Sequence, residues 1–154
     1  MEYAVSISGM SELQDQLADM LETADTSIAK TADFISQSTA QRARAKIRTS
    51  PPTGRYYEQL GHRASAPGEP PANLSGFLAD SIRWQKFNTT GMVGSVGAGA
   101  SYATTLEFGG YARLSPEFGG GLAYIEPRPF LYPSFIEALN SAKGKLKKEF
   151  EARL

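Results

Sequence analysis

The sequence predicts an α+β domain, in which a long N-terminal helical segment and a C-terminal helix pack on a small antiparallel β-sheet. Apolar residues recur every three or four positions over residues 10–47 and again over residues 135–150, which is the spacing of one helix face. Between these stretches, residues 82–87 and 92–98 have the composition of two strands joined at residues 88–91. The 154 residues, 41% hydrophobic and 21% charged, suit a single domain with a modest core.

The N-terminal helix is expected to begin after Gly9, because Ser11 and Gln14 have the spacing of a capping box. A single helix reaching Arg48 would extend beyond a small domain, since each residue adds about 1.5 Å. Either the helix projects from the domain or it breaks at residues 23–27, where Thr and Ser offer a second start, and we expect the break. The apolar stripe is interpreted as core, with a coiled coil to another chain as the alternative.

Residues 50–72 are expected to form a long proline-rich arm. They contain five of the nine prolines and show no periodicity, which is typical of a segment that is functional or disordered. Cations and aromatic residues stand between the prolines, and a plain linker would lack such anchors. We interpret the segment as an arm that orders against neighbouring chains, with a floppy linker as the alternative. Its contact candidates are Arg55, Tyr56, Tyr57 and Arg63.

Two short helices are expected on either side of the predicted hairpin. The first follows Ser75, whose side chain can cap its N-terminus. The second spans residues 102–108, whose apolar side chains lie close to helical spacing, and Gly109 is expected to end it in a left-handed conformation. Residues 109–126 are then interpreted as a Gly-rich loop, with Tyr111, Arg113 and Phe118 as contact candidates.

The last helix is expected to start from a rigid entry segment. Pro127, Pro129 and Pro133 each fix φ, and Pro133 suits the first helical position, where no N–H is needed. Glu107 and Arg128 both stand among apolar residues, where an unpaired charge is costly. We therefore expect an ion pair between Glu107 and Arg128 that ties the short helix to the entry segment. Two separately solvated charges are the alternative.

The net charge is zero, but the charges are segregated along the chain. Residues 1–34 hold seven acidic side chains against Lys30 alone, whereas residues 35–63 hold six basic side chains against Glu58 alone. Acidic residues near the start of a helix and basic residues near its end interact favourably with the helix dipole, so this segregation needs no partner. They also suit an acidic end that meets a basic end of a neighbouring copy in a head-to-tail ring. The contact candidates at the basic end are Arg42, Arg44 and Arg48.

The side chains of common catalytic and metal sites are largely missing. His62 is the single histidine and lies in the proline-rich arm, so a Ser-His-Asp triad would lack a rigidly held base. One histidine without cysteine leaves a zinc site short of ligands, and the lack of cysteine suits a reducing cytoplasm. Residues 94–99 match no nucleotide-binding motif, and Glu107 with Glu126 indicates no substrate cleft. We expect no enzyme, no catalytic residues, no metal, no cofactor and no small-molecule substrate.

A membrane partner is not expected either. No apolar run approaches the roughly 20 residues that a membrane span needs. The neutral overall charge also gives no general attraction to nucleic acid.

Two blocks of sequence resemble a known family. Residues 102–109 read Tyr-Ala-x-x-Leu-Glu-Phe-Gly, and residues 128–133 read Arg-Pro-Phe-Leu-x-Pro. Together with further matches at residues 6–9, 66–71 and 74–82, this pattern resembles the tail-completion or neck proteins of long-tailed bacteriophages, the family named for the gene-ten product of phage HK-ninety-seven. The resemblance covers nearly the whole chain as one domain, although the loop between the two blocks is longer than the family pattern implies.

The resemblance implies a structural virion protein at the phage head–tail junction, assembled in the host cytoplasm as a homo-oligomeric ring. It implies connector or head-closure proteins and tail-tube proteins as partners, with DNA passing through the lumen without sequence-specific binding. Six copies are implied for a tail end, and twelve would fit a connector layer. The alternative is a nucleic-acid-binding protein that uses the basic helix end Arg42–Arg48 and Arg55, whose binding would depend steeply on salt.

Overall fold

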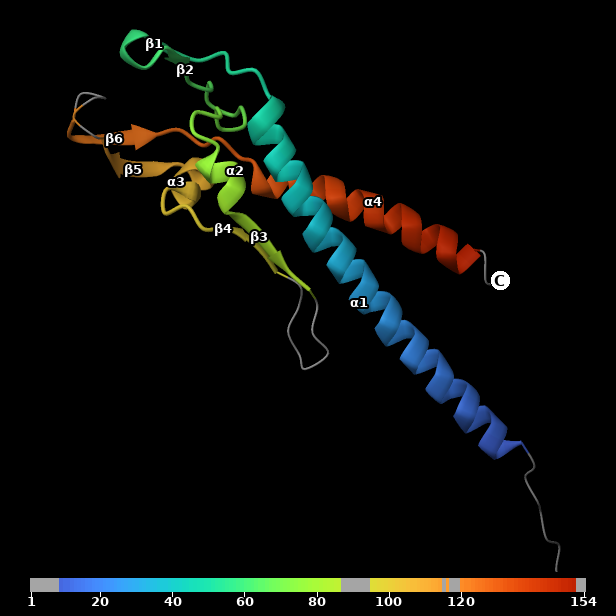
Figure 1. The fold of residues 1–154 in the computed structure, drawn as a ribbon. Helices are drawn as coiled ribbons and strands as arrows, with labels where there is room; N and C mark the ends of the chain where they lie inside the picture. Colours follow the sequence, from blue (N-terminus) through green and yellow to red (C-terminus); the bar gives the residue numbers. More distant parts are fainter. Residues whose placement is uncertain (1–8, 87–94, 115, 117–119, 152–154) are drawn as a thin grey trace, which may run out of the picture.

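The computed structural model describes residues 9–86, 95–114, 116 and 120–151. Within this part of the chain, α4 packs along the C-terminal half of α1, and the short helices and strands gather on one side of that half (Figure 1). The strands pair as three antiparallel ribbons, β1–β2, β3–β4 and β5–β6, so the α+β prediction is confirmed. In chain order the elements are α1 (Met10–Thr49), β1 (Tyr56–Tyr57), η1 (Glu58–Leu60), β2 (His62–Arg63), α2 (Phe77–Ser81), β3 (Ile82–Gln85), β4 (Ser95–Ala98), α3 (Ala103–Phe108), β5 (Gly110–Arg113), β6 (Leu122–Ile125) and α4 (Leu131–Glu151).

α1 is one unbroken helix, so the break expected at residues 23–27 is wrong. The helix contains neither glycine nor proline, the residues that most readily interrupt one. A hydroxyl group inside a helix need not interrupt it, as the next turn shows, where Thr31 Oγ1 donates to the carbonyl oxygen of Ser27 at 2.7 Å. The helix therefore projects beyond the other described elements, which was the other possibility (Figure 1).

The start of α1 also differs from the prediction. Gly9 is its N-cap residue, in the left-handed region with φ 93°, and no side chain caps the helix. Ser11 Oγ donates to the Glu12 carboxylate at 3.1 Å, so the expected capping box of Ser11 and Gln14 is not formed.

The core lies between the C-terminal half of α1 and the elements that follow it. Ala40, Ala43 and Ile47 of α1 are buried, and Phe130 is the largest fully buried side chain among the described residues. The apolar stripe of α1 is thus core only in its C-terminal half. At residues 10–28 its large side chains are exposed. The other buried apolar residues are Leu78, Ala79, Ile82, Ala100, Ala103, Ala138 and Ala142.

The contact between α1 and α4 also includes a group of charged side chains. Glu137 of α4 accepts from Lys46 Nζ at 2.6 Å and from Arg42 Nη1 at 3.2 Å. Arg42 Nη2 also donates to Ser141 Oγ at 3.1 Å. The hydrogen bond from Lys46 is the main cause that lowers the pKa of Glu137. Charged groups at the rim of this contact therefore hold the two helices in one alignment.

The proline-rich segment 50–72 contains a short hairpin that the sequence did not predict. β1 and β2 pair within it, and the Gly54 N–H donates to the carbonyl oxygen of Ala64 at 2.9 Å. The segment is joined to the entry of the last helix, because the Gly68 N–H donates to the carbonyl oxygen of Pro127 at 2.8 Å.

The predicted strand pair and the predicted stop at Gly109 are both present. β3 pairs with β4 from Ile82 opposite Ala98 to Gln85 opposite Ser95, while the expected turn at residues 88–91 lies outside the described residues. α3 ends at Gly109 as predicted, but with φ 76° and ψ 171° this glycine does not have the left-handed helical conformation that was expected. Within residues 109–126, where we expected a loop, β5 and β6 form a ribbon.

Candidate assembly surfaces

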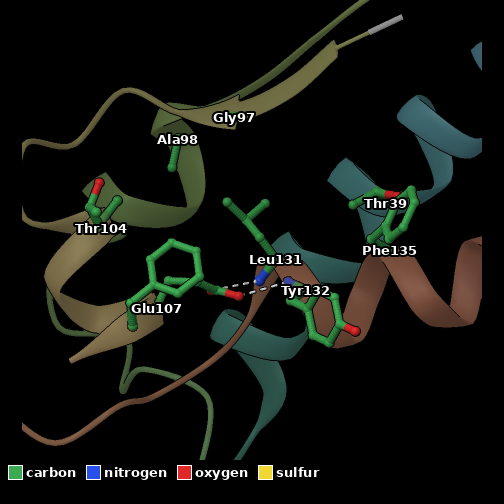
Figure 2. Close-up of a pocket in the computed structure, with 10 residues that line it drawn as sticks. Thr39, Gly97, Ala98, Thr104, Glu107, Leu131, Tyr132 and Phe135 are labelled. Carbon is green, nitrogen blue, oxygen red and sulfur yellow. Dashed lines mark hydrogen bonds between the residues drawn. The ribbon is translucent and has the colours of Figure 1, made fainter.

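The buried carboxylate of Glu107 caps the N-terminus of α4. Glu107, in the last turn of α3, is 6% exposed. It accepts hydrogen bonds from the backbone N–H groups of Leu131 (3.0 Å) and Tyr132 (2.7 Å), which Figure 2 shows, and from that of Phe130 (2.8 Å). A helix start leaves four N–H groups without partners inside the helix, and the fourth position here is Pro133, which has no N–H. α4 therefore begins at Leu131, two residues before the predicted start at Pro133.

The ion pair expected between Glu107 and Arg128 is not formed, because each group has other partners. Arg128 Nε donates to the carbonyl oxygen of Ser65 at 3.2 Å, and its Nη1 donates to the carbonyl oxygen of Glu126 at 2.8 Å. The short helix and the entry segment are linked instead by the Glu107 cap and by a backbone hydrogen bond, in which the Arg128 N–H donates to the carbonyl oxygen of Leu106 at 2.6 Å.

An open cavity of about 390 Å³ lies beside this cap, between β4, α3 and the start of α4 (Figure 2). Three aromatic side chains on its wall are partly exposed: Phe108 at 73%, Tyr132 at 64% and Phe135 at 39%. Glu107 also lines the cavity, but its carboxylate is engaged by three amides. The arrangement suits an apolar side chain of a partner better than acid–base chemistry.

The described residues form neither a metal site nor a membrane-spanning helix. No group of three or more His, Asp or Glu side chains there could hold a metal ion. The helices of this part of the chain include none with the length and apolar character to cross a membrane.

The three arginines predicted as contacts at the basic end of α1 all bind within the chain. Arg42 binds Glu137 of α4, as described above. Arg44 Nη2 donates to the carbonyl oxygen of Ile82 at 2.6 Å, and Arg48 pairs with Asp80. These side chains were expected to be free for a neighbouring subunit or for nucleic acid, but they tie α1 to α4, β3 and α2.

Four further candidates come together on the β1–β2 hairpin. The Arg63 guanidinium lies 5.8 Å from the centre of the Tyr56 ring, directly across the two strands. The Arg55 guanidinium lies 5.2 Å from the centre of the Tyr57 ring. Cations over tyrosine rings keep the side chains extended on the surface, with Tyr56 half exposed.

The β5–β6 ribbon has one exposed face, which we call the ribbon face: Tyr111, Arg113, Leu122 and Tyr124. Tyr111 is paired with Tyr124 across the strands, and their rings meet edge to face with centroids 5.4 Å apart. Tyr111 and Leu122 are 71% and 72% exposed. Tyr111 and Arg113 were candidates from the sequence, whereas Tyr124 and Leu122 were missed. The signal that could have identified them was the alternation of large and small side chains over residues 122–124. The remaining candidate, Phe118, lies outside the described residues.

Another exposed surface runs along the projecting half of α1, and we call it the α1 stripe. All of its side chains except Leu21 were predicted to be core, yet they are 49–68% exposed. The neighbouring acidic residues of this half face solvent as well. The members of the α1 stripe are Met10, Leu13, Leu17, Met20, Leu21 and Ile28.

One family of proteins matches the sequence. The match spans residues 15–109, well over half of the chain, and the family is described as "Bacteriophage HK97-gp10, putative tail-component". It confirms the resemblance found in the sequence, and it ends before β5, β6 and α4. No curated protein matches the chain, and neither does any solved structure.

Proposed function

Because the chain belongs to the bacteriophage HK97-gp10-like family of tail components, we propose that it is a structural protein of the phage head–tail junction. In this role it assembles into a ring of identical copies around the DNA channel. It acts by docking and carries out no catalysis. Its other partners are the connector or head-closure proteins on one side and the tail-tube proteins on the other.

The observation that supports this proposal is the amount of apolar surface outside the core. The α1 stripe, the ribbon face and the aromatic wall of the cavity all expose large apolar side chains. Monomeric proteins rarely expose patches of this kind unless a partner covers them. Tyrosine, phenylalanine, methionine and arginine are also the residues enriched in protein interfaces. The composition of these surfaces suits a subunit that buries them in an assembly.

The nucleic-acid alternative is less well supported. Arg42 and Arg48 pair with acidic side chains of the same chain, and Arg44 donates to a backbone carbonyl. Cations that are already engaged release fewer counterions on binding a phosphate backbone. In the proposed ring, DNA passes through the channel without sequence-specific binding, and the protein acts mainly by docking to other proteins.

Native mass spectrometry of the purified chain tests the proposal, together with electron microscopy of the same sample. We expect closed rings with one copy number, which is six if the protein ends the tail and twelve if it forms a connector layer. Cryo-electron microscopy of the virion neck then places the ring. Fluorescence anisotropy with duplex DNA at about 50 and 200 mM salt is expected to show no steep loss of affinity. A chain that stays monomeric and binds DNA in a salt-dependent way would overturn the proposal.

A further inference from the structure

The projecting half of α1 has an apolar side that no other described part of the chain covers (Figure 1). With 3.6 residues per turn, the members of the α1 stripe fall within roughly 100° of the helix circumference. Most of the stability of a helix in a protein comes from packing of its apolar face and not from intrinsic propensity. Packing of this side against another surface would therefore stabilise the helix itself.

Apart from Asp25, the side chains around the α1 stripe carry no charge over residues 10–28. The positions that flank it hold Gln14, Gln16, Thr23 and Ser27. The same helical geometry places the acidic side chains on the far side or, for Asp25, beyond the edge of the stripe. These acidic residues are Glu12, Asp15, Asp19, Glu22 and Asp25.

This arrangement of charge favours a second copy of the same helix as the occupant. Two identical helices that meet through the α1 stripe bring few like charges together across the contact, because every acidic residue of this half except Asp25 lies on the far side. A partner selected by opposite charge would find only Asp25 to pair with, at the edge of this side. A stripe that is about 100° wide is also typical of helices packed in a bundle, whereas a two-stranded coiled coil needs a narrower seam.

The α1 stripe also continues a surface that already holds a helix. Further along the same side of α1, Arg42 binds Glu137 of α4. The Lys145 ammonium of α4 lies 3.6 Å from the centre of the Phe34 ring. α4 thus covers this side of α1 in its C-terminal half, and the same side lies open over residues 10–28.

We propose that the α1 helices of neighbouring copies pack against each other through the α1 stripe, and that this contact joins the subunits of the assembly. The inference rests on the ring proposed above, and it names the element that makes the contact between copies. The acidic side of each helix then faces outward from the contact.

Cysteine cross-linking tests this directly, because the natural chain contains no cysteine. Leu17→Cys places a thiol at the centre of the α1 stripe, and Asp19→Cys places the matched control thiol on the acidic side. Both variants are treated with a short bismaleimide at concentrations where the unsubstituted chain forms rings. We expect at least fivefold more cross-linked dimer from Leu17→Cys than from Asp19→Cys. Equal cross-linking within intact rings would overturn the stripe contact and leave the ring proposal standing.

A second variant measures how much the contact contributes to assembly. The double variant Leu17→Gln with Met20→Gln replaces two side chains that are exposed in the single chain. Its circular dichroism spectrum is therefore expected to match that of the unsubstituted chain. The ring should dissociate at concentrations at least tenfold higher than for the unsubstituted chain. Asp15→Asn with Asp19→Asn is the control and should assemble normally. Unchanged assembly of the glutamine variant would overturn the inference. Absence of rings in the unsubstituted chain would overturn the proposed function itself, and this inference with it.

Discussion

The carboxylate of Glu107 lies 2.7 Å from the backbone nitrogen of Tyr132 and so joins the end of α3 to the first turn of α4. A negative charge at this place is favourable, since the N-terminus of a helix carries a partial positive charge. The three amide donors belong to successive residues, which locks the direction in which α4 leaves the entry segment. The two blocks that carried the family resemblance are therefore joined by a side-chain cap.

Replacing Glu107 tests this cap. We expect Glu107→Ala to lower the free energy of unfolding by about 2–3 kcal/mol, because amides in a buried setting lose a charged acceptor. Glu107→Gln keeps one carbonyl oxygen and should lose about half as much. Urea denaturation of both variants measures the effect. Glu126→Ala, at an exposed side chain, is the control and should change the stability by less than about 0.5 kcal/mol. A Glu107→Ala protein as stable as this control would contradict the cap.

Two glycines are expected to respond in opposite directions to the same substitution. Gly109 has φ +76°, and a Cβ there would lie 3.0 Å from Pro127 Cδ and 3.1 Å from the carbonyl oxygen of Ile125. Gly109→Ala should therefore destabilise the protein by about 1–3 kcal/mol. Gly144 lies inside α4 with open space around it, so Gly144→Ala should stabilise by roughly 0.5–1 kcal/mol. Thermal melts of the two variants provide the comparison, and a stabilising Gly109→Ala would count against the strained turn.

The pairing of Glu137 predicts a dependence of stability on pH. The hydrogen bond from Lys46 is the main cause that lowers the pKa of Glu137 from its usual 4.5, and the charge of Arg42 contributes. A carboxyl group with a lowered folded-state pKa stabilises the protein at neutral pH, and this contribution is lost as the pH falls from about 4.5 through the lowered value. Glu137→Gln should therefore lose less unfolding free energy than the natural chain between pH 7 and about pH 3.

Urea titrations at the two pH values measure this difference. Because Glu137 is partly exposed, solvent screening keeps the effect small. Glu126→Gln should retain the full acid sensitivity of the natural chain. If Glu137→Gln lost as much stability in acid as Glu126→Gln, the lowered pKa of Glu137 would make no contribution to the acid sensitivity of the protein.

The ribbon face predicts a variant that assembles poorly and folds well. Tyr111→Ala with Leu122→Ser removes two exposed side chains, so the free energy of unfolding should change by less than about 0.5 kcal/mol. Ring formation should need at least tenfold more protein if these side chains are interface anchors. Native mass spectrometry across a dilution series measures this, with the exposed Asn140→Ala of α4 as control. Normal assembly of the double variant would show that the ribbon face is not part of the interface.

The predictions that proved correct depended on local pattern. The helical spacing of residues 10–47 indicated the long helix, and the composition of residues 82–98 indicated the β3–β4 pair. Gly109 ended the short helix as expected, because a positive φ suits a glycine at that place. Such features depend on the conformational preferences of residues that are only a few positions apart. These preferences do not depend on contacts with distant parts of the chain.

The candidate contacts were harder to predict because their partners lie far away in the sequence. Arg44 binds a carbonyl group of Ile82, and Arg42 binds Glu137, so a basic run that looked free is engaged within the chain. Tyr111 and Arg113 were identified without Tyr124, because the pairing of β5 with β6 depends on a turn that a Gly-rich segment does not specify by pattern.

By itself the sequence determined the helical character of residues 10–49, the strand pair before α3 and the family to which the chain belongs. Only the tertiary structure decided which half of α1 is buried, since the same apolar spacing continues through both halves and α4 covers only one of them. It also decided the role of Glu107. A carboxylate among apolar residues needs partners, and whether they are a guanidinium or backbone amides depends on where the chain has placed the start of a helix.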